Sequence, residues 1–335
     1  MKPSFIMKSH LAKALLLATM LTGCSTGSDP ETDTPQPQPG QPSSTKASLL
    51  VYGKIQDNTI IPTSTTRAGW NSDYKIGIYQ VNIVQERPTV STLINNRQYV
   101  IATPTTEGKF EPADDSQAIT LEQTTTLNAY APYTQSLMNN IYAISLTDQT
   151  NPGSIDLMTA KATAAVSSGV KVTTAQFNFE HRLCKIEVTL LNEINMEGFI
   201  QEQVEASMSN QHVQGTYNLA SGAVNATGEA NATIKMFVPQ DDNPEDNKIK
   251  AEAIVMPVSA ENASASRTMV FRINGKEFSY DIPKSHVYKA GTKVTYDIRI
   301  TPKELVVKAT VTDWETDTVI NPNGNPVPGE AYPAN

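Results

Sequence analysis

The most specific chemical signal in the sequence surrounds Cys24, which ends the tetrapeptide Leu-Thr-Gly-Cys at 21–24. Small residues before a cysteine let a lipoprotein signal peptidase close on the chain, and the thiol can take a diacylglyceryl group. A lysine-bearing start and a short apolar run at 15–21 precede this motif. The run is too short to span a bilayer, which needs roughly 20 apolar residues. We therefore predict a signal peptide at 1–23 and lipidation of Cys24; the alternative is an ordinary signal peptide with a chance cysteine.

The other groups that could support catalysis are scattered along the sequence. His181, His212 and His286 lie far apart, and no two histidines have the H-E-x-x-H spacing of a zinc site. Cys184 falls on the inward face of a predicted strand, where a thiol is inert more often than reactive. We therefore expect no catalytic residue, no cofactor and no metal ion, and we expect that the chain is not an enzyme. The alternative is an enzyme whose active site matches no motif that we recognise in the sequence.

Two charged segments each allow a functional and a structural interpretation. His181 and Arg182 together could bind an anion, but local hydrogen bonds at a strand edge explain the pair better. The acidic run Asp241–Asp246 offers the carboxylate oxygens that calcium prefers. Its spacing matches no ligand loop, so a solvated turn is favoured over a bound ion.

The charge balance restricts the partners. The chain has a formal net charge of −8, and removal of the signal peptide with Lys2, Lys8 and Lys13 takes this to −11. An acidic chain is a poor partner for nucleic acid and for a negatively charged membrane surface. Any attachment to a membrane is therefore expected to come from the lipid on Cys24.

The elements that carry these residues are predicted to be β-strands. Threonine, valine, isoleucine and tyrosine occur in short runs punctuated by glycine, asparagine and proline, which predicts an all-β fold. Alternation predicts a first strand at Ala47–Ile55, and Asn274-Gly275 between two alternating runs predicts a tight hairpin. The alternation changes parity near Arg182, so a bulge or burial on both faces is expected there.

The composition shifts divide the chain into five parts. We predict the signal peptide at 1–23, a disordered tether at 24–45 and a first β-sandwich domain at 46–170. A second β-sandwich domain is predicted at 171–316, followed by a mobile, Pro- and Gly-rich tail at 317–335. The expected architecture is therefore two β-sandwich domains in tandem.

An ordered set of segments along nearly the whole mature chain resembles the fimbrillin family, the FimA-like and Mfa-like subunits of type V pili. No single segment is specific; the order of the set carries the resemblance. It consists of Cys24 in its lipobox, Thr66-Arg67-Ala68 and Trp70 after the first strand, Ile76–Tyr79, Asn128–Tyr133, Phe179–Ile186, Ile254–Pro257, Tyr288–Thr292 and Val311–Trp314.

The resemblance implies transthyretin-like domains and a maturation step. It implies export as a lipoprotein, followed by cleavage after Arg67 by an arginine-directed protease, which leaves Ala68 as the new N-terminus. The released first strand would leave a groove for a strand of another pilin subunit. The implied location is the outer membrane for the lipidated precursor and the cell-surface fimbrium for the mature subunit, which would serve adhesion to a host or bacterial surface ligand.

The donor strand and the fate of the lipid stay open at this stage. The segment after Trp314 would supply the donor in a stalk subunit, but Pro322, Pro326 and Pro328 weaken it as a strand. The stalk, tip and anchor roles therefore remain alternatives. Arg67 could also be an exposed loop residue with no processing role. In that case the chain would be a permanently lipid-anchored surface protein, either a pilus anchor or a binder of glycans or other ligands.

Overall fold

Alternating apolar and polar residues give strands with one buried face, and strands form almost all of the regular structure. The computed structural model describes residues 46–55, 70, 72–103, 107–194, 196–197, 199–240, 247–258, 266–301, 305–313 and 327–328, all within the unit Ser44–Asn335. The helical elements described are α1 (Pro152–Ile155) and the two 3-10 turns η1 (Asp115–Gln117) and η2 (Gln201–Gln203). The prediction of an all-β fold is confirmed. No helix in the described part of the chain is long and apolar enough to cross a membrane.

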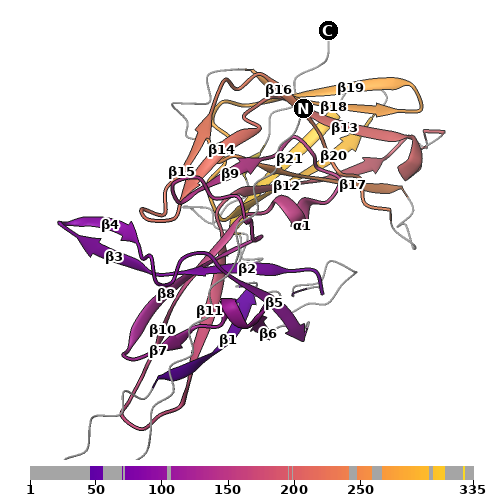
Figure 1. Ribbon diagram of the computed structural model, residues 1–335. Helices are drawn as coiled ribbons and strands as arrows, with labels where there is room; N and C mark the ends of the chain where they lie inside the picture. The colour runs from indigo at the N-terminus through magenta and orange to yellow at the C-terminus, as the bar shows by residue number, and fades with distance from the viewer. Residues whose placement is uncertain are drawn as a thin grey trace, which may run out of the picture. The chain divides into compact units, whose positions relative to one another are not determined.

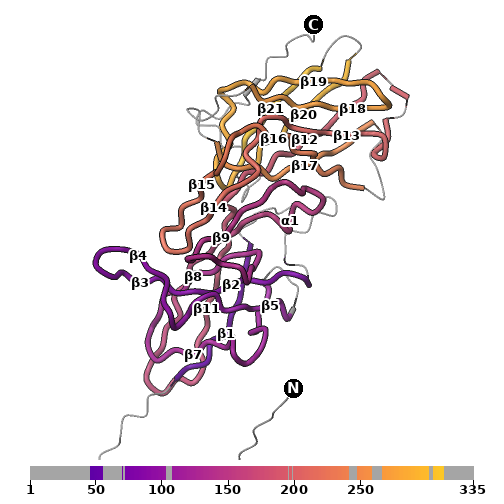
Figure 2. The backbone as a smooth tube through the Cα atoms, turned by 45° about the horizontal axis from the view of Figure 1, so that its top comes forward, coloured from indigo at the N-terminus to yellow at the C-terminus, as the bar shows by residue number. Residues whose placement is uncertain are grey.

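The first half of the chain builds an eight-stranded sheet in the order β11-β10-β8-β2-β5-β6-β1-β7. Because β11 also pairs with β1, every strand except β7 belongs to a closed ring of hydrogen-bonded neighbours. The strands are β1 (Ala47–Ile55), β2 (Lys75–Tyr79), β5 (Arg97–Thr103), β6 (Glu107–Pro112), β7 (Thr120–Leu121), β8 (Thr125–Ala131), β10 (Met158–Ala164) and β11 (Val172–His181). Figures 1 and 2 show β1, at the start of the described chain, lying against β11.

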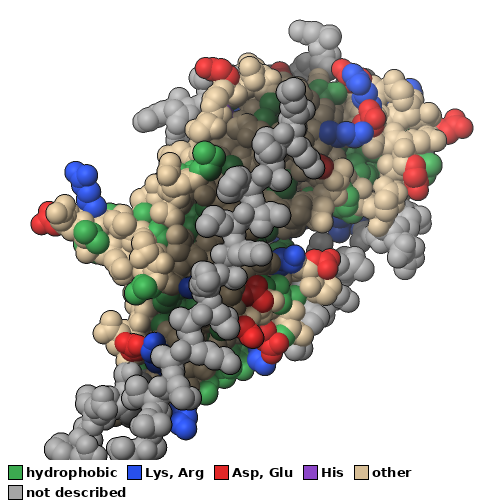
Figure 3. All heavy atoms as spheres, in the orientation of Figure 1, with side chains coloured by type: hydrophobic (Ala, Val, Ile, Leu, Met, Phe, Trp, Pro, Cys, Tyr) green, Lys and Arg blue, Asp and Glu red, His purple; other side chains and the backbone are tan. Residues whose placement is uncertain are grey.

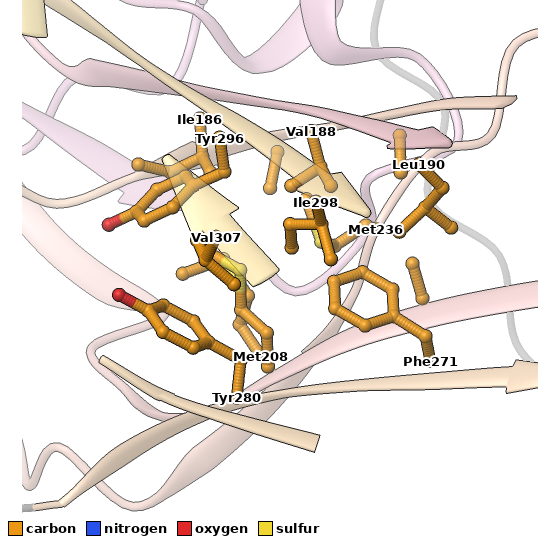
Figure 4. Packing of buried hydrophobic residues seen from close by; sticks show 14 of the residues in the cluster. Ile186, Val188, Leu190, Met208, Met236, Phe271, Tyr280, Tyr296, Ile298 and Val307 are labelled. Atoms are coloured by element: carbon orange, nitrogen blue, oxygen red, sulfur yellow. The ribbon is translucent and has the colours of Figure 1, made fainter. Parts of the chain in front are cut away.

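The second half places two sheets on either side of one apolar core. One has the order β17-β12-β20-β21-β22 and the other β16-β13-β18-β19. Their strands are β12 (Cys184–Asn192), β13 (Val204–Gln211), β16 (Ala232–Lys235), β17 (Lys248–Val255), β18 (Arg267–Ile273), β19 (Lys276–Ile282), β20 (Thr292–Ile300), β21 (Leu305–Asp313) and β22 (Val327–Pro328). Figure 4 shows Val188 and Ile298 of the first sheet facing Met208 and Phe271 of the second. This half is therefore a sandwich of two packed sheets.

Two smaller sheets complete the structure. β9 (Ile141–Ser145) pairs with β14 (Gln214–Asn218), which also pairs with β15 (Val224–Thr227). The hairpin of β3 (Val81–Val84) and β4 (Arg87–Val90) forms the other sheet.

The passage between the halves differs from the expected boundary at 170/171. β11 lies after that boundary but is hydrogen-bonded to β1 and β10 in the first sheet. β12 begins at Cys184 and pairs instead with β17 and β20. Of the two expectations near Arg182, the ladders of β11 and β12 show no bulge there, and the adjacent residues Leu183 and Cys184 are both fully buried, in different apolar clusters. The parity changes because the chain leaves one sheet and enters another. The transthyretin-like character of the two halves stays a prediction.

Candidate functional site

The first strand, β1, is embedded in the sheet instead of lying at its edge. It pairs in parallel with β11 from Ser48↔Val172 to Ile55↔Phe179. On its other side it pairs antiparallel with β6 and, at its start, with β7. We call the position that β1 fills, between β11 on one side and β6 and β7 on the other, the β1 slot. The backbone of β1 is therefore hydrogen-bonded to neighbouring strands on both sides.

The inward face of β1 closes the core of the first half. Ala47 and Val51 are fully buried and Leu49 is 7 % exposed, whereas Ser48 and Leu50 on the other face are exposed. Leu49 and Val51 belong to the same apolar cluster as Phe110 and Phe179. Without β1, this cluster would face solvent along the length of a strand.

Trp70 fixes the end of β1 from inside the core. Its indole is 2 % exposed, and Nε1 donates a hydrogen bond to the Gly53 carbonyl oxygen at 2.7 Å. The ring makes edge-on contacts with Phe110 and Phe179, with centroid distances of 5.0 and 5.1 Å. This residue directly follows the segment 56–69, which joins β1 to the rest of the chain and carries Arg67. A single side chain thus connects the two ends of that segment.

A pair of glycines makes room for the indole. Gly53 of β1 lies opposite Gly108 of β6 in the ladder. A Cβ atom on Gly108 would lie 2.7 Å from Trp70 Cδ1, closer than van der Waals contact allows. A glycine inside a strand often marks such a close approach, and the two glycines were the sequence signal that could have located this site.

The residues predicted to be processed are not among those that the structure describes. Cys24, Arg67 and Ala68 lie outside the described residues, as does the acidic run Asp241–Asp246. In the part of the chain that is described, no group of acidic, histidine or cysteine residues is arranged to hold a metal ion.

The other candidate residues lie in separate, locally bonded environments. His181 Nδ1 lies 2.7 Å from Asp156 Oδ2, and both side chains are only 8 % exposed. Arg182 pairs with Glu180 at 3.1 Å and donates to the Thr159 hydroxyl. These bonds at the end of β11 match the structural interpretation of the His181–Arg182 pair rather than an anion site.

Cys184 and His286 are held in the second half. Burial raises the pKa of the Cys184 thiol to about 12, and its Sγ lies 3.5 Å from the Thr292 hydroxyl. Burial and the nearby Arg267 lower the pKa of His286. Cys184 lies on β12 and His181 on β11, and the two strands belong to different sheets.

The described residues also line one open hollow of about 520 Å³, beside Gln149, Glu202 and Phe237. Its charged side chains are Asp148, Glu202, Glu205 and Lys235, and its lining contains no histidine or cysteine. Lys235 is paired with Glu205 at 3.6 Å, with both side chains well exposed. On the face seen in Figure 3, basic and acidic side chains are interspersed. We therefore take the β1 slot as the candidate functional site.

The fold and the slot define an all-β protein completed by its own first strand, and comparison with known families identifies the class. A family model described as Fimbrillin-like matches residues 63–314. The chain belongs to the fimbrillin-like family, which comprises fimbrial structural proteins and is not an enzyme family. Membership implies a cell-surface location and assembly with other pilin subunits.

Individual relatives agree with this assignment. The protein named "Putative fimbrium subunit Fim1C" of Bacteroides uniformis is 29 % identical over 321 residues, which cover 92 % of this chain and 95 % of that protein. A crystal structure of "a putative cell adhesion protein" from Bacteroides uniformis has a TM-score of 0.62 at 26 % identity, covering 82 % of this chain and all of that one. A structure with the same description from Bacteroides ovatus has a TM-score of 0.63 at 21 % identity, covering 80 % and 98 %. The last likeness shows the fold alone.

Proposed function

We propose that this chain is a structural subunit of a cell-surface fimbria that matures by losing its first strand. In this proposal the precursor is exported as a lipoprotein on Cys24 and cut between Arg67 and Ala68. It then polymerises when a strand of another subunit enters the β1 slot, and the resulting fimbria serves adhesion.

The observation that carries the proposal is the position of β1 within its sheet. β1 is joined to the rest of the protein only through the segment that holds Arg67. After a cut there, β1 is held by its ladders with β6, β7 and β11 and by its buried side chains alone. Its departure would leave unpaired backbone groups beside an apolar groove, which is a template for an incoming strand.

The family match covers the part of the chain on the C-terminal side of β1. The matched region begins at residue 63 and ends at residue 314. Under this proposal the lipid on Cys24 carries the precursor to the outer membrane and leaves with β1.

The decisive experiment compares Arg67→Ala with a matched control, Arg87→Ala, which removes an exposed arginine from β4. We expect Arg67→Ala to abolish surface fibres and to accumulate lipidated precursor, whereas Arg87→Ala assembles normally. N-terminal sequencing of wild-type fibres should give Ala68 as the first residue. Fibres from Arg67→Ala that retain the N-terminal strand would refute the maturation step.

A second function is favoured by the completeness of the uncut fold. With β1 in place, the first half has a closed core and no empty groove at this position. Such a chain could remain on the membrane as a permanently lipidated pilus anchor or ligand-binding protein. Mature surface material that all carries lipid on Cys24, with no polymer, would establish this alternative.

A further inference from the structure

The inward face of the β1 slot is not uniform along its length. Ala47, Leu49 and Val51 occupy three successive inward positions, and Gly53 occupies the fourth. A Cβ atom at Gly53 would lie 2.8 Å from Phe110 Cε2, 3.2 Å from Phe179 Cε2 and 3.4 Å from Trp70 Cζ2. The slot therefore accepts aliphatic side chains at its second and third positions and has no space for one at the fourth.

The three rings that fill this space also restrain one another. Trp70 meets both phenylalanines edge-on and meets Tyr74 at a centroid distance of 5.0 Å. Trp70, Phe110 and Phe179 are each no more than 2 % exposed. A ring in a close-packed core cannot swing away without displacing its neighbours. Trp70 Nε1 also bonds the carbonyl oxygen of the residue at the fourth position.

We propose that the β1 slot admits only a donor strand with glycine at the position of Gly53. Such a strand runs parallel to β11 and carries a small residue at the position of Ala47 and aliphatic residues at those of Leu49 and Val51. This inference rests on the proposed function, since it specifies the strand that replaces β1. It makes Trp70, Phe110 and Phe179 the residues that select the partner.

The tail of this chain does not meet that requirement. Aligning Gly324 with Gly53 places Thr318, Ile320 and Pro322 at the other inward positions. Aligning Gly329 instead places Asn323, Asn325 and Val327 there. The first alignment puts a proline where Val51 packs, and the second buries two amides without partners, which is costly. The donor strand is therefore not the tail of a second copy.

The experiment uses the full chain with a sequence-specific protease site in place of residues 62–67, so that the cut does not depend on processing at Arg67. After the cut, labelled peptides in excess compete with the resident β1, and native mass spectrometry measures the fraction exchanged. The peptides span residues 46–55 with the natural sequence, with Gly53→Val or with Ser48→Val, and a fourth spans the tail residues 317–329.

Whether Gly53→Val strengthens or weakens binding of the peptide shows whether the slot has a steric limit at this position. Valine is a better strand former than glycine, so a slot without a steric limit would bind the Gly53→Val peptide more tightly. We expect it to bind at least about tenfold more weakly than the natural sequence, because overpacking a rigid core is unfavourable. Ser48→Val, on the exposed face, should bind at least as well as the natural peptide. The tail peptide should not enter.

The outcomes separate the two proposals. If Gly53→Val enters as readily as the natural sequence, the glycine requirement is wrong while strand exchange stands. Entry of the tail peptide at the level of the natural sequence would overturn the exclusion of the tail as donor. If not even the natural sequence exchanges, strand replacement at this slot is wrong, and the proposed function fails with it.

Discussion

At the scale of single residues, the side chains with the most reactive chemistry are those the fold makes inert. Cys184 is completely buried on β12, and His181 is paired with Asp156. Trp70, which has no reactive group, instead joins β1 to the core through one hydrogen bond and three ring contacts. The reactive groups of Cys184 and His181 are therefore buried, and Trp70 contacts β1 through packing and one hydrogen bond.

The Cys184 thiol gives a test of this statement. Its pKa is raised to about 12 by burial, so the thiolate is scarce at pH 8 and grows only as the pH approaches that value. In a Cys24→Ser background, we expect alkylation at pH 8 to be at least about a hundredfold slower in the folded chain than in denaturant, because only the thiolate reacts. Mass spectrometry follows the alkylation. Equal alkylation rates in the folded and the denatured chain would contradict the burial of this thiol.

At the scale of elements, the turn chemistry of the β18–β19 hairpin shows how local sequence fixes one part of the fold. Asn274 and Gly275 connect the strands with φ values of 47° and 76°. Two positive φ values match the right-handed twist of the strands they join. The predicted hairpin is confirmed, with Met269 opposite Tyr280 and Ile273 opposite Lys276.

Gly275 allows the backbone contribution of this turn to be measured alone. An added Cβ would meet no atom within 4 Å, so any cost of Gly275→Ala comes from the left-handed backbone. We expect the free energy of unfolding to fall by about 1 kcal/mol, measured by urea denaturation. Lys276→Ala, at the adjacent exposed position, is the control and should change stability little. An equal effect of the two substitutions would rule out backbone strain at residue 275.

At the scale of the whole molecule, the two halves are bonded to each other by strand pairing and by buried polar groups. β9 pairs with β14, and the Tyr79 and Tyr217 hydroxyls lie 3.1 Å apart. Gln149 donates to the carbonyl oxygens of Leu146 and Ile254 and accepts from the Ile254 amide at 2.8 Å. These contacts hold the two halves together within the described unit.

Gln149 should therefore contribute strongly to the stability of the described unit. Its side chain is 3 % exposed, and truncation leaves buried backbone groups of Ile254 without their partner. We expect Gln149→Ala to lower the free energy of unfolding by about 3 kcal/mol, measured by urea denaturation. The control, Gln214→Ala, removes an exposed amide whose Nε2 lies 3.4 Å from the Ser145 hydroxyl. If Gln149→Ala lowers the free energy of unfolding no more than the control does, the hydrogen bonds of Gln149 contribute little to stability.

The sequence alone determined the strands and their inward faces where the information is local. Alternation gave β1 its bounds at Ala47 and Ile55, and Asn274-Gly275 gave a hairpin, because both depend on neighbouring residues only. The motif at Cys24 is likewise contiguous. Arg67 was proposed from an ordered resemblance and lies outside the described residues.

Only the tertiary structure decided which strands are partners. The parity change near Arg182 predicts either a bulge or burial on both faces, and the structure shows its cause: β11 pairs with β1, whereas β12 starts a different sheet. Gly53, Gly108 and Trp70 are separated along the chain, so no local pattern could show that the glycines make room for the indole. A strand pattern specifies a face and a period, but its partners follow from packing the whole chain.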